Sequence, residues 1–125
     1  MSIRVALAGR HDLYRSHVAA ALSRQPGFVL VLQAAGARQA AEAIAALPPA
    51  DQPQALLLDM DPPGREGLAG LRTLAQRHPA LRIVAVSLHE DAPLREAAVR
   101  AGAAAWIGKD RPWQELLEAL RGSRI

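Results

Sequence analysis

The chain has 125 residues, half of them hydrophobic and 22% charged, a composition that predicts one compact globular domain over residues 1–125 and excludes a disordered tail. It contains no cysteine, which excludes disulfides and thiol catalysis. The formal net charge is only +3 and the arginines are scattered along the sequence, so we expect no direct binding of DNA by this chain.

No apolar run approaches the roughly 18 residues that a membrane span needs. The apolar stretch near the N-terminus is also too short for a signal peptide. We therefore expect a soluble, cytoplasmic protein without a membrane partner.

The period of the apolar residues switches repeatedly along the chain between two residues, typical of strands, and 3.6 residues, typical of helices. Proline and glycine separate many of the segments, for example Pro26-Gly27 and Pro48-Pro49. In chain order the pattern predicts a strand over 3–8, a helix over 13–22, a strand over 28–34, a helix over 38–47, a strand over 54–59, a helix over 68–75, a strand over 81–87, a helix over 91–101, a strand over 104–108 and a helix over 113–120.

Strict alternation of buried-looking strands with helices predicts a doubly wound α/β fold, in which right-handed crossovers build a five-stranded parallel sheet covered on both faces. In such sheets, ligands bind beyond the carboxyl ends of the strands. The polar residues at those ends are therefore the candidates for function.

Three polar residues of different chemistry follow three of the predicted strands. Asp59 ends an apolar run and precedes a Pro-Pro-Gly turn, Ser87 ends the next strand, and Lys109, the only lysine, follows the last. A carboxylate, a hydroxyl and an ammonium at one edge suit phosphoryl chemistry. Each residue alone also has an ordinary explanation: a satisfied strand-end carboxylate, a helix cap and a surface charge.

The segments LLLDMDPPGREGL (56–68), HPALRIVAVSLHED (78–91) and RAGAAAWIGKD (100–110) resemble the receiver domain of two-component response regulators. The resemblance runs from Ile3 to Arg121 and is strongest to receivers that precede a helix-turn-helix DNA-binding domain. It implies a flavodoxin-like fold with strand order 2-1-3-4-5. It also implies that Asp59 is the phospho-acceptor, Ser87 the switch hydroxyl, Trp106 the switch aromatic residue and Lys109 the phosphoryl-contacting lysine.

The sequence departs from the family at the first strand, where Gly9 and Arg10 stand in place of two acidic residues that help to hold Mg²⁺. The side chain of Asp59 and the backbone carbonyl of Asp61 remain for the ion, which prefers several oxygen ligands, so we expect Mg²⁺ binding to be weak or lost and no other cofactor. Asp12 is better explained as a helix N-cap than as a substitute ligand. Arg10 is expected to pair with Asp59 or Asp61, the alternative being that it points to solvent.

The large indole of Trp106 is expected to stay outward and to form, with Leu116 of the last helix, a surface for a partner or a second copy. The alternative is that Trp106 and Trp113 cover the edges of the core.

Three hypotheses for function remain open. The first is an atypical receiver, not an enzyme, that works as an interaction or dimerisation module without Mg²⁺-dependent phosphorylation. Its expected partners are a second copy of the chain and a histidine kinase, and DNA would be bound only through a separate output domain. The second is a working phospho-acceptor at Asp59 with degraded metal affinity. The third is a small nucleotide- or flavin-binding enzyme, although no glycine-rich phosphate-binding motif follows a strand.

Overall fold

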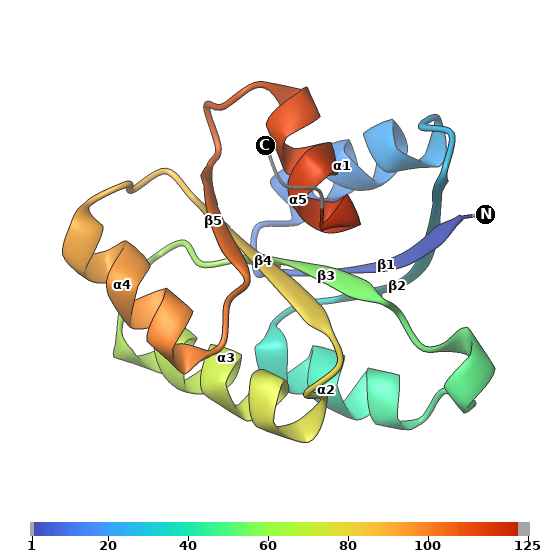
Figure 1. Cartoon of the computed structure of the whole chain (residues 1–125), viewed down its shortest axis with the longest axis horizontal. Helices are drawn as coiled ribbons and strands as arrows, with labels where there is room; N and C mark the ends of the chain where they lie inside the picture. The colour runs from blue at the N-terminus through green and yellow to red at the C-terminus, as the bar shows by residue number, and fades with distance from the viewer. Residues whose placement is uncertain (1, 123–125) are drawn as a thin grey trace.

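The computed structural model describes residues 2–122, which form a five-stranded sheet between two layers of helices (Figure 1). The strands are β1 (Ile3–Ala8), β2 (Phe28–Ala34), β3 (Ala55–Asp59), β4 (Arg82–Ser87) and β5 (Ala105–Gly108). The helices are α1 (Asp12–Ser23), α2 (Ala37–Ala45), the 3₁₀ turn η1 (Pro49–Asp51), α3 (Arg65–Arg77), α4 (Ala92–Ala101) and α5 (Trp113–Arg121). All neighbouring strands are parallel and their order is β2-β1-β3-β4-β5, which confirms the predicted fold class and topology.

Every predicted strand and helix is present, with bounds within three residues of the prediction. The short η1 turn was not predicted; it begins at Pro49, whose ring fixes φ near the value of a helical turn. Gly102 ends α4 with a φ of +125°, a conformation that residues with a Cβ rarely adopt.

The sheet buries a separate apolar cluster on each face. Along β3, Leu56 and Leu58 point to the face that α2, α3 and α4 cover, whereas Ala55 and Leu57 point to the face that α1 and α5 cover. This alternation follows from the two-residue period of a strand. Because both faces are buried, β3 is apolar at every position before its last residue, Asp59.

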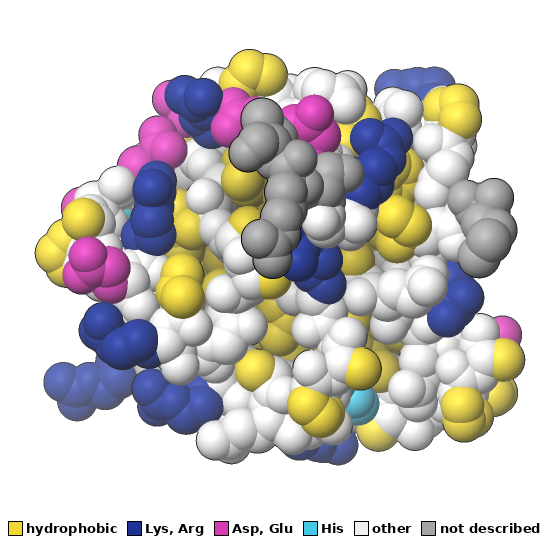
Figure 2. Space-filling model, viewed as in Figure 1, with side chains coloured by type: hydrophobic (Ala, Val, Ile, Leu, Met, Phe, Trp, Pro, Cys, Tyr) yellow, Lys and Arg dark blue, Asp and Glu magenta, His cyan; other side chains and the backbone are white. Residues whose placement is uncertain are grey.

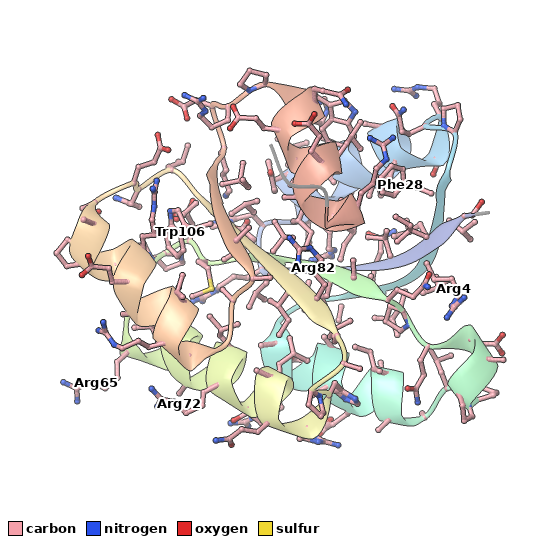
Figure 3. The ribbon with its side chains drawn as sticks, viewed as in Figure 1. Arg4, Phe28, Arg65, Arg72, Arg82 and Trp106 are labelled. Carbon is pink, nitrogen blue, oxygen red and sulfur yellow. The ribbon has the colours of Figure 1, made fainter. Side chains whose placement is uncertain are left out.

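On the face shown in Figure 2, hydrophobic side chains are scattered and the basic ones lie in several separate places. One basic group gathers at the lower left, where Figure 3 places Arg65 and Arg72 on α3. Leu13, Leu88 and Val99 are large apolar side chains that remain more than half exposed. Between residues 2 and 122, no helix is long and apolar enough to cross a membrane.

Candidate functional site

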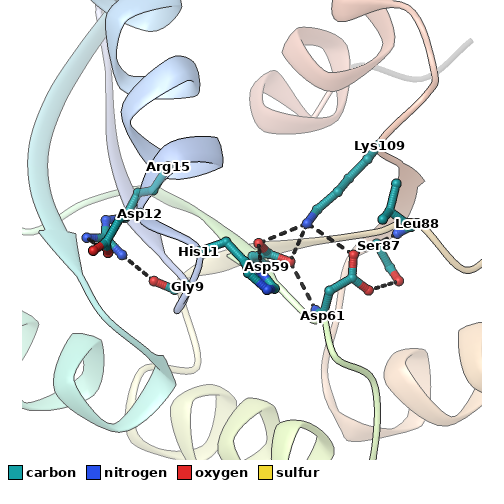
Figure 4. Close-up of polar contacts among 9 residues, drawn as sticks. All are labelled: Gly9, His11, Asp12, Arg15, Asp59, Asp61, Ser87, Leu88 and Lys109. Atoms are coloured by element: carbon teal, nitrogen blue, oxygen red, sulfur yellow. Dashed lines mark hydrogen bonds and ion pairs between the residues drawn. The ribbon is translucent and has the colours of Figure 1, made fainter.

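The structure brings the three predicted site residues together at the carboxyl edge of the sheet (Figure 4). Asp59 is the last residue of β3, Ser87 is the last residue of β4, and Lys109 directly follows β5. The parallel register aligns these strand ends, since Ser87 pairs with Gly108 and the Lys109 amide donates to the Ser87 carbonyl at 2.8 Å. Strand-end placement therefore predicted the juxtaposition correctly.

The carboxylate of Asp59 is nearly buried and both of its oxygens have partners. The Lys109 Nζ lies 2.9 Å from Oδ1 and 3.0 Å from Oδ2. The His11 Nδ1 lies 3.2 Å from Oδ2, and the Asp61 amide donates to Oδ1 at 3.0 Å. These contacts offset much of the cost of burying a carboxylate, because the charge is paired and its lone pairs are used.

A second buried carboxylate, that of Asp61, shares the same lysine. Its Oδ1 accepts a hydrogen bond from the Ser87 hydroxyl at 2.5 Å. Its Oδ2 accepts one from the Leu88 amide at 2.9 Å and lies 3.0 Å from the Lys109 Nζ. Burial alone would raise the pKa of Asp61, but the hydrogen bonds from Ser87 and Leu88 and the charge of Lys109 lower its pKa below the usual 3.8.

Sequence reasoning assigned only the backbone carbonyl of Asp61 to the site and missed its side chain. The available signal was a second aspartate two positions after Asp59, in the turn that leaves the same strand. A residue at that position can turn back toward the neighbouring strand ends. Spacing along the chain does not indicate which donors it meets there.

Tyr14 of α1 is a further neighbour that the sequence did not single out. The Lys109 Nζ lies 4.4 Å from the centroid of its ring, within the range of a cation–π contact. Burial, and then the negative charges of Asp59 and Asp61, raises the pKa of Tyr14 to about 12. The phenol therefore stays neutral over a wide pH range.

The predicted pairing of Arg10 with Asp59 or Asp61 is wrong. Arg10 is exposed and, among the described residues, forms no ion pair. Lys109 and His11 surround the Asp59 carboxylate instead, and Arg10 follows the end of β1 with its side chain in solvent.

The expected N-cap role of Asp12 is also incorrect. The N-cap of α1 is His11, and Asp12 is the first residue of the helix. The Asp12 Oδ1 accepts a hydrogen bond from Arg15 Nη2 at 2.8 Å, and a second guanidinium nitrogen of Arg15 donates to the Gly9 carbonyl (Figure 4).

Gly9 is required by close approach of the chain to Asp59. A Cβ added at Gly9 would lie 2.6 Å from the Asp59 Cβ, so a side chain at this position would force one of the two strand ends to move. A carboxylate at position 9 therefore cannot be added to this geometry without a rearrangement.

The side chains present do not match the Mg²⁺ site that the resemblance implies. Between residues 2 and 122, no three side chains of His, Asp or Glu are placed to share a metal ion. The two carboxylates at the edge, Asp59 and Asp61, already share Lys109. Mg²⁺ needs several oxygen ligands with room around them for the ion, and here the ammonium of Lys109 lies between the two carboxylates.

The expectation that Trp106 stays outward is wrong. The residue is only 7% exposed, and its side chain packs in the cluster under α2, α3 and α4 (labelled in Figure 3). The indole Nε1 donates to the His89 carbonyl at 3.0 Å, which satisfies the one polar group of the ring. Leu116 is 5% exposed and packs on the opposite face of the sheet, so the two residues do not form a shared surface.

A family model described as the response regulator receiver domain matches residues 5–121. The chain belongs to the response regulator receiver domain family, which confirms the resemblance seen in the sequence and places it among the modules of two-component signalling. It is 31% identical over 119 residues to the response regulator GacA of Pseudomonas viridiflava, covering 95% of this chain and 54% of that protein. It is 25% identical to the transcriptional regulatory protein DegU of Brevibacillus brevis, covering 95% and 49%. The chain thus spans about half the length of the curated relatives that it matches.

Solved structures give the same result. A LuxR-family two-component response regulator from Aurantimonas sp. SI85-9A1 aligns with a TM-score of 0.83 and 26% identity, over 99% of this chain and 89% of that one. The signal receiver domain of NarL from Mycobacterium tuberculosis aligns with a TM-score of 0.79 and 26% identity, over 97% and 98%.

Proposed function

We propose that this chain is an atypical receiver module, over residues 1–125, of a cytoplasmic transcription regulator, and that it acts through protein contacts without Mg²⁺-dependent phosphorylation of Asp59. The relatives support the regulatory part, since one is named a transcriptional regulatory protein and another a LuxR-family response regulator. In this proposal a second copy of the chain and a histidine kinase are the partners. DNA is bound only by a separate output domain.

One observation carries the proposal: the Asp59 carboxylate is already paired on both oxygens. A phospho-acceptor needs an oxygen free to attack and a cation that bridges it to the incoming phosphoryl group. Here Lys109 contacts both oxygens, His11 contacts one, and glycine and arginine stand where acids would help to hold the ion. We therefore expect Mg²⁺ to bind weakly.

The second hypothesis, phosphorylation of Asp59 despite weak metal binding, keeps one argument in its favour. Asp59, Ser87 and Lys109 lie at one edge of the sheet, where Lys109 contacts Asp59 and the Ser87 hydroxyl contacts Asp61, which shares the same lysine. The third hypothesis, a nucleotide- or flavin-binding enzyme, has little support. Two hollows beside β5 measure about 290 Å³ and 200 Å³, at or below the lower end of the usual range of ligand pockets.

Incubation with acetyl phosphate, with and without millimolar Mg²⁺, tests the proposal when the intact mass is measured afterwards. We expect little or no phosphorylated product and no dependence on Mg²⁺. Asp59→Asn serves as the control for labelling at other sites. Rapid, Mg²⁺-dependent labelling that Asp59→Asn abolishes would overturn the proposal in favour of the second hypothesis.

The predicted homodimer needs a separate measurement, because neither Trp106 nor Leu116 offers an exposed surface for it. Sedimentation of the chain over a wide concentration range should show reversible self-association. A monomer at every concentration would remove dimerisation from the proposal and leave the phosphorylation result unaffected.

A further inference from the structure

The donors that meet at Asp61 are those of an oxyanion-binding site. A hydroxyl from Ser87, a backbone amide from Leu88 and the ammonium of Lys109 converge from the ends of two neighbouring strands. Hydroxyls, amides and ammonium groups that point into one small space bind carboxylate, sulfate and phosphate oxygens well. In this chain the space holds the Asp61 side chain, which is 7% exposed (Figure 4).

Burial of this side chain is not imposed by its place in the sequence. Asp61 follows β3 in a turn whose next residue, Pro62, is exposed, as is Gly64. A carboxylate in such a turn would normally stay in water, because removing it from water is costly. The three donors therefore supply what holds it inside.

A chain of hydrogen bonds links the Asp61 carboxylate to Trp106. The Ser87 Oγ that donates to Asp61 also accepts a bond from the His89 amide at 3.0 Å. The carbonyl of His89 accepts the bond from the Trp106 indole at 3.0 Å. The position of the Ser87 hydroxyl is thus tied to the loop over 87–89 and, through that loop, to the buried indole.

We propose that Ser87, the Leu88 amide and Lys109 form an oxyanion site whose occupant is the chain's own Asp61 carboxylate, which holds the loop over 87–89 and Trp106 in place without an external ligand. The inference rests on the proposed function, because the Asp61 carboxylate would hold this edge of the sheet in place while Asp59 is not phosphorylated. An internal ligand is always present at the site, so an external anion must compete with it. The like charge of Asp61 further excludes such an anion.

The test replaces the internal ligand and offers an external one. Trp113→Phe leaves Trp106 as the only tryptophan of the chain, so its fluorescence reports on the indole beside the loop. In this background, Asp61→Ala should bind inorganic phosphate or sulfate saturably, at least about tenfold more tightly than the parent, which corresponds to about 1.4 kcal/mol. Asp51→Ala removes the same charge from an exposed residue before β3 and should behave like the parent.

Adding Ser87→Ala to Asp61→Ala should abolish the gained binding, because the hydroxyl donor is lost. Equal anion binding by the parent, Asp61→Ala and Asp51→Ala would overturn the inference, since it would mean general charge screening or an adventitious ion only. Labelling of Asp59 by acetyl phosphate is measured separately, so failure of the proposed function is distinguishable from failure of this inference.

A second variant covers the case in which Asp61→Ala does not fold. Ser87→Ala keeps the carboxylate and removes the link from Asp61 to the His89 amide, so the emission of Trp106 should shift. Ser87→Thr keeps a hydroxyl at the same position and should restore the parent spectrum. Identical Trp106 emission in the parent and in Ser87→Ala would contradict the inference.

Discussion

The ammonium of Lys109 lies 3.0 Å from Oδ2 of Asp61 while it also contacts both oxygens of Asp59. One cation thus lies between two buried carboxylates, and its own side chain is only 10% exposed. Removing one partner from a buried ionic cluster leaves uncompensated charge in a poorly solvated place. We therefore expect the lysine to be central to the stability of this edge of the sheet.

We predict that Lys109→Met lowers the free energy of unfolding by about 3–5 kcal/mol, because two carboxylates then lie side by side without a cation. Urea unfolding followed by circular dichroism measures the change. Arg111→Met is the control: it removes a more exposed ion pair with Glu115, which water screens, and should destabilise the chain far less. Equal effects of the two substitutions would show that Lys109 does not stabilise the pair of carboxylates.

The lowered pKa of Asp61 predicts a dependence of stability on pH. The unfolded chain takes up its proton near 3.8, whereas the folded chain takes it up at a lower pH. The stability that the ionised carboxylate contributes is therefore complete above that value and is lost as the pH falls toward the folded-state pKa. Urea unfolding at a series of acidic pH values should show this loss.

Asp61→Asn removes the titrating group and should make stability depend less steeply on pH below about 4. Asp51→Asn, at an exposed position, should leave the dependence unchanged. The prediction fails if Asp61→Asn and the parent lose stability in parallel on acidification.

The contact between Gly9 and Asp59 predicts that position 9 does not tolerate a side chain. Gly9→Ala should lower the free energy of unfolding by about 1–3 kcal/mol, because its Cβ would overlap the Asp59 Cβ. Gly67→Ala in α3 is the matched control. Its added Cβ would lie in ordinary contact, 3.5 Å from the Met60 Cε, and alanine should stabilise the helix by up to about 1 kcal/mol.

The same contact revises an experiment that the sequence suggests. Restoring an acidic pair with Gly9→Asp and Arg10→Asp would recover Mg²⁺ binding only if the ends of β1 or β3 shift to admit the new side chain. Arg10→Asp alone places a carboxylate at an exposed position without that overlap. If Gly9→Ala is as stable as the parent, the close approach to Asp59 does not restrict the side chain at position 9.

The fold was predictable from the sequence because each level of pattern agrees with the others. Apolar period, turn residues and strict alternation all indicate one doubly wound sheet, and strand-end placement put Asp59, Ser87 and Lys109 at one edge. The direction of individual side chains was not predictable in this way. Arg10 directly precedes His11, which contacts Asp59, but its own side chain is exposed. Asp61, in contrast, turns inward to donors that follow two strands distant in sequence, β4 and β5.

The burial of Trp106 illustrates the same limit. Its size suggested that the indole would stay outward, and this argument considered the ring alone and not its neighbours. In the structure, space in the cluster under α4 and a free carbonyl at His89 accommodate both the ring and its N–H group. Packing volume and hydrogen-bond partners depend on the assembled layers, which the spacing of one residue along the chain does not describe.

Tyr14 offers a direct measurement of the electrostatics at this edge, because it is the only tyrosine of the chain. Burial, followed by the negative charges of Asp59 and Asp61, raises the pKa of its phenol from 10.0 to about 12. The folded protein should therefore show no tyrosinate absorbance until the pH is well above 10.0, whereas the urea-unfolded chain should titrate near that value. Between the two values the unfolded state binds fewer protons, so stability should fall as the pH rises.

Asp59→Asn removes the carboxylate that, of the two, raises the pKa of Tyr14 more, so it should lower the pKa of the phenol toward 10.0. Asp51→Asn removes the same charge from an exposed residue before β3 and should leave the titration unchanged. Ultraviolet difference absorbance of the three folded proteins, recorded as the pH is raised, makes the comparison. If the parent titrates near 10.0 while still folded, or if Asp59→Asn leaves the midpoint where it was, the ionised carboxylates do not act on Tyr14 as the geometry requires.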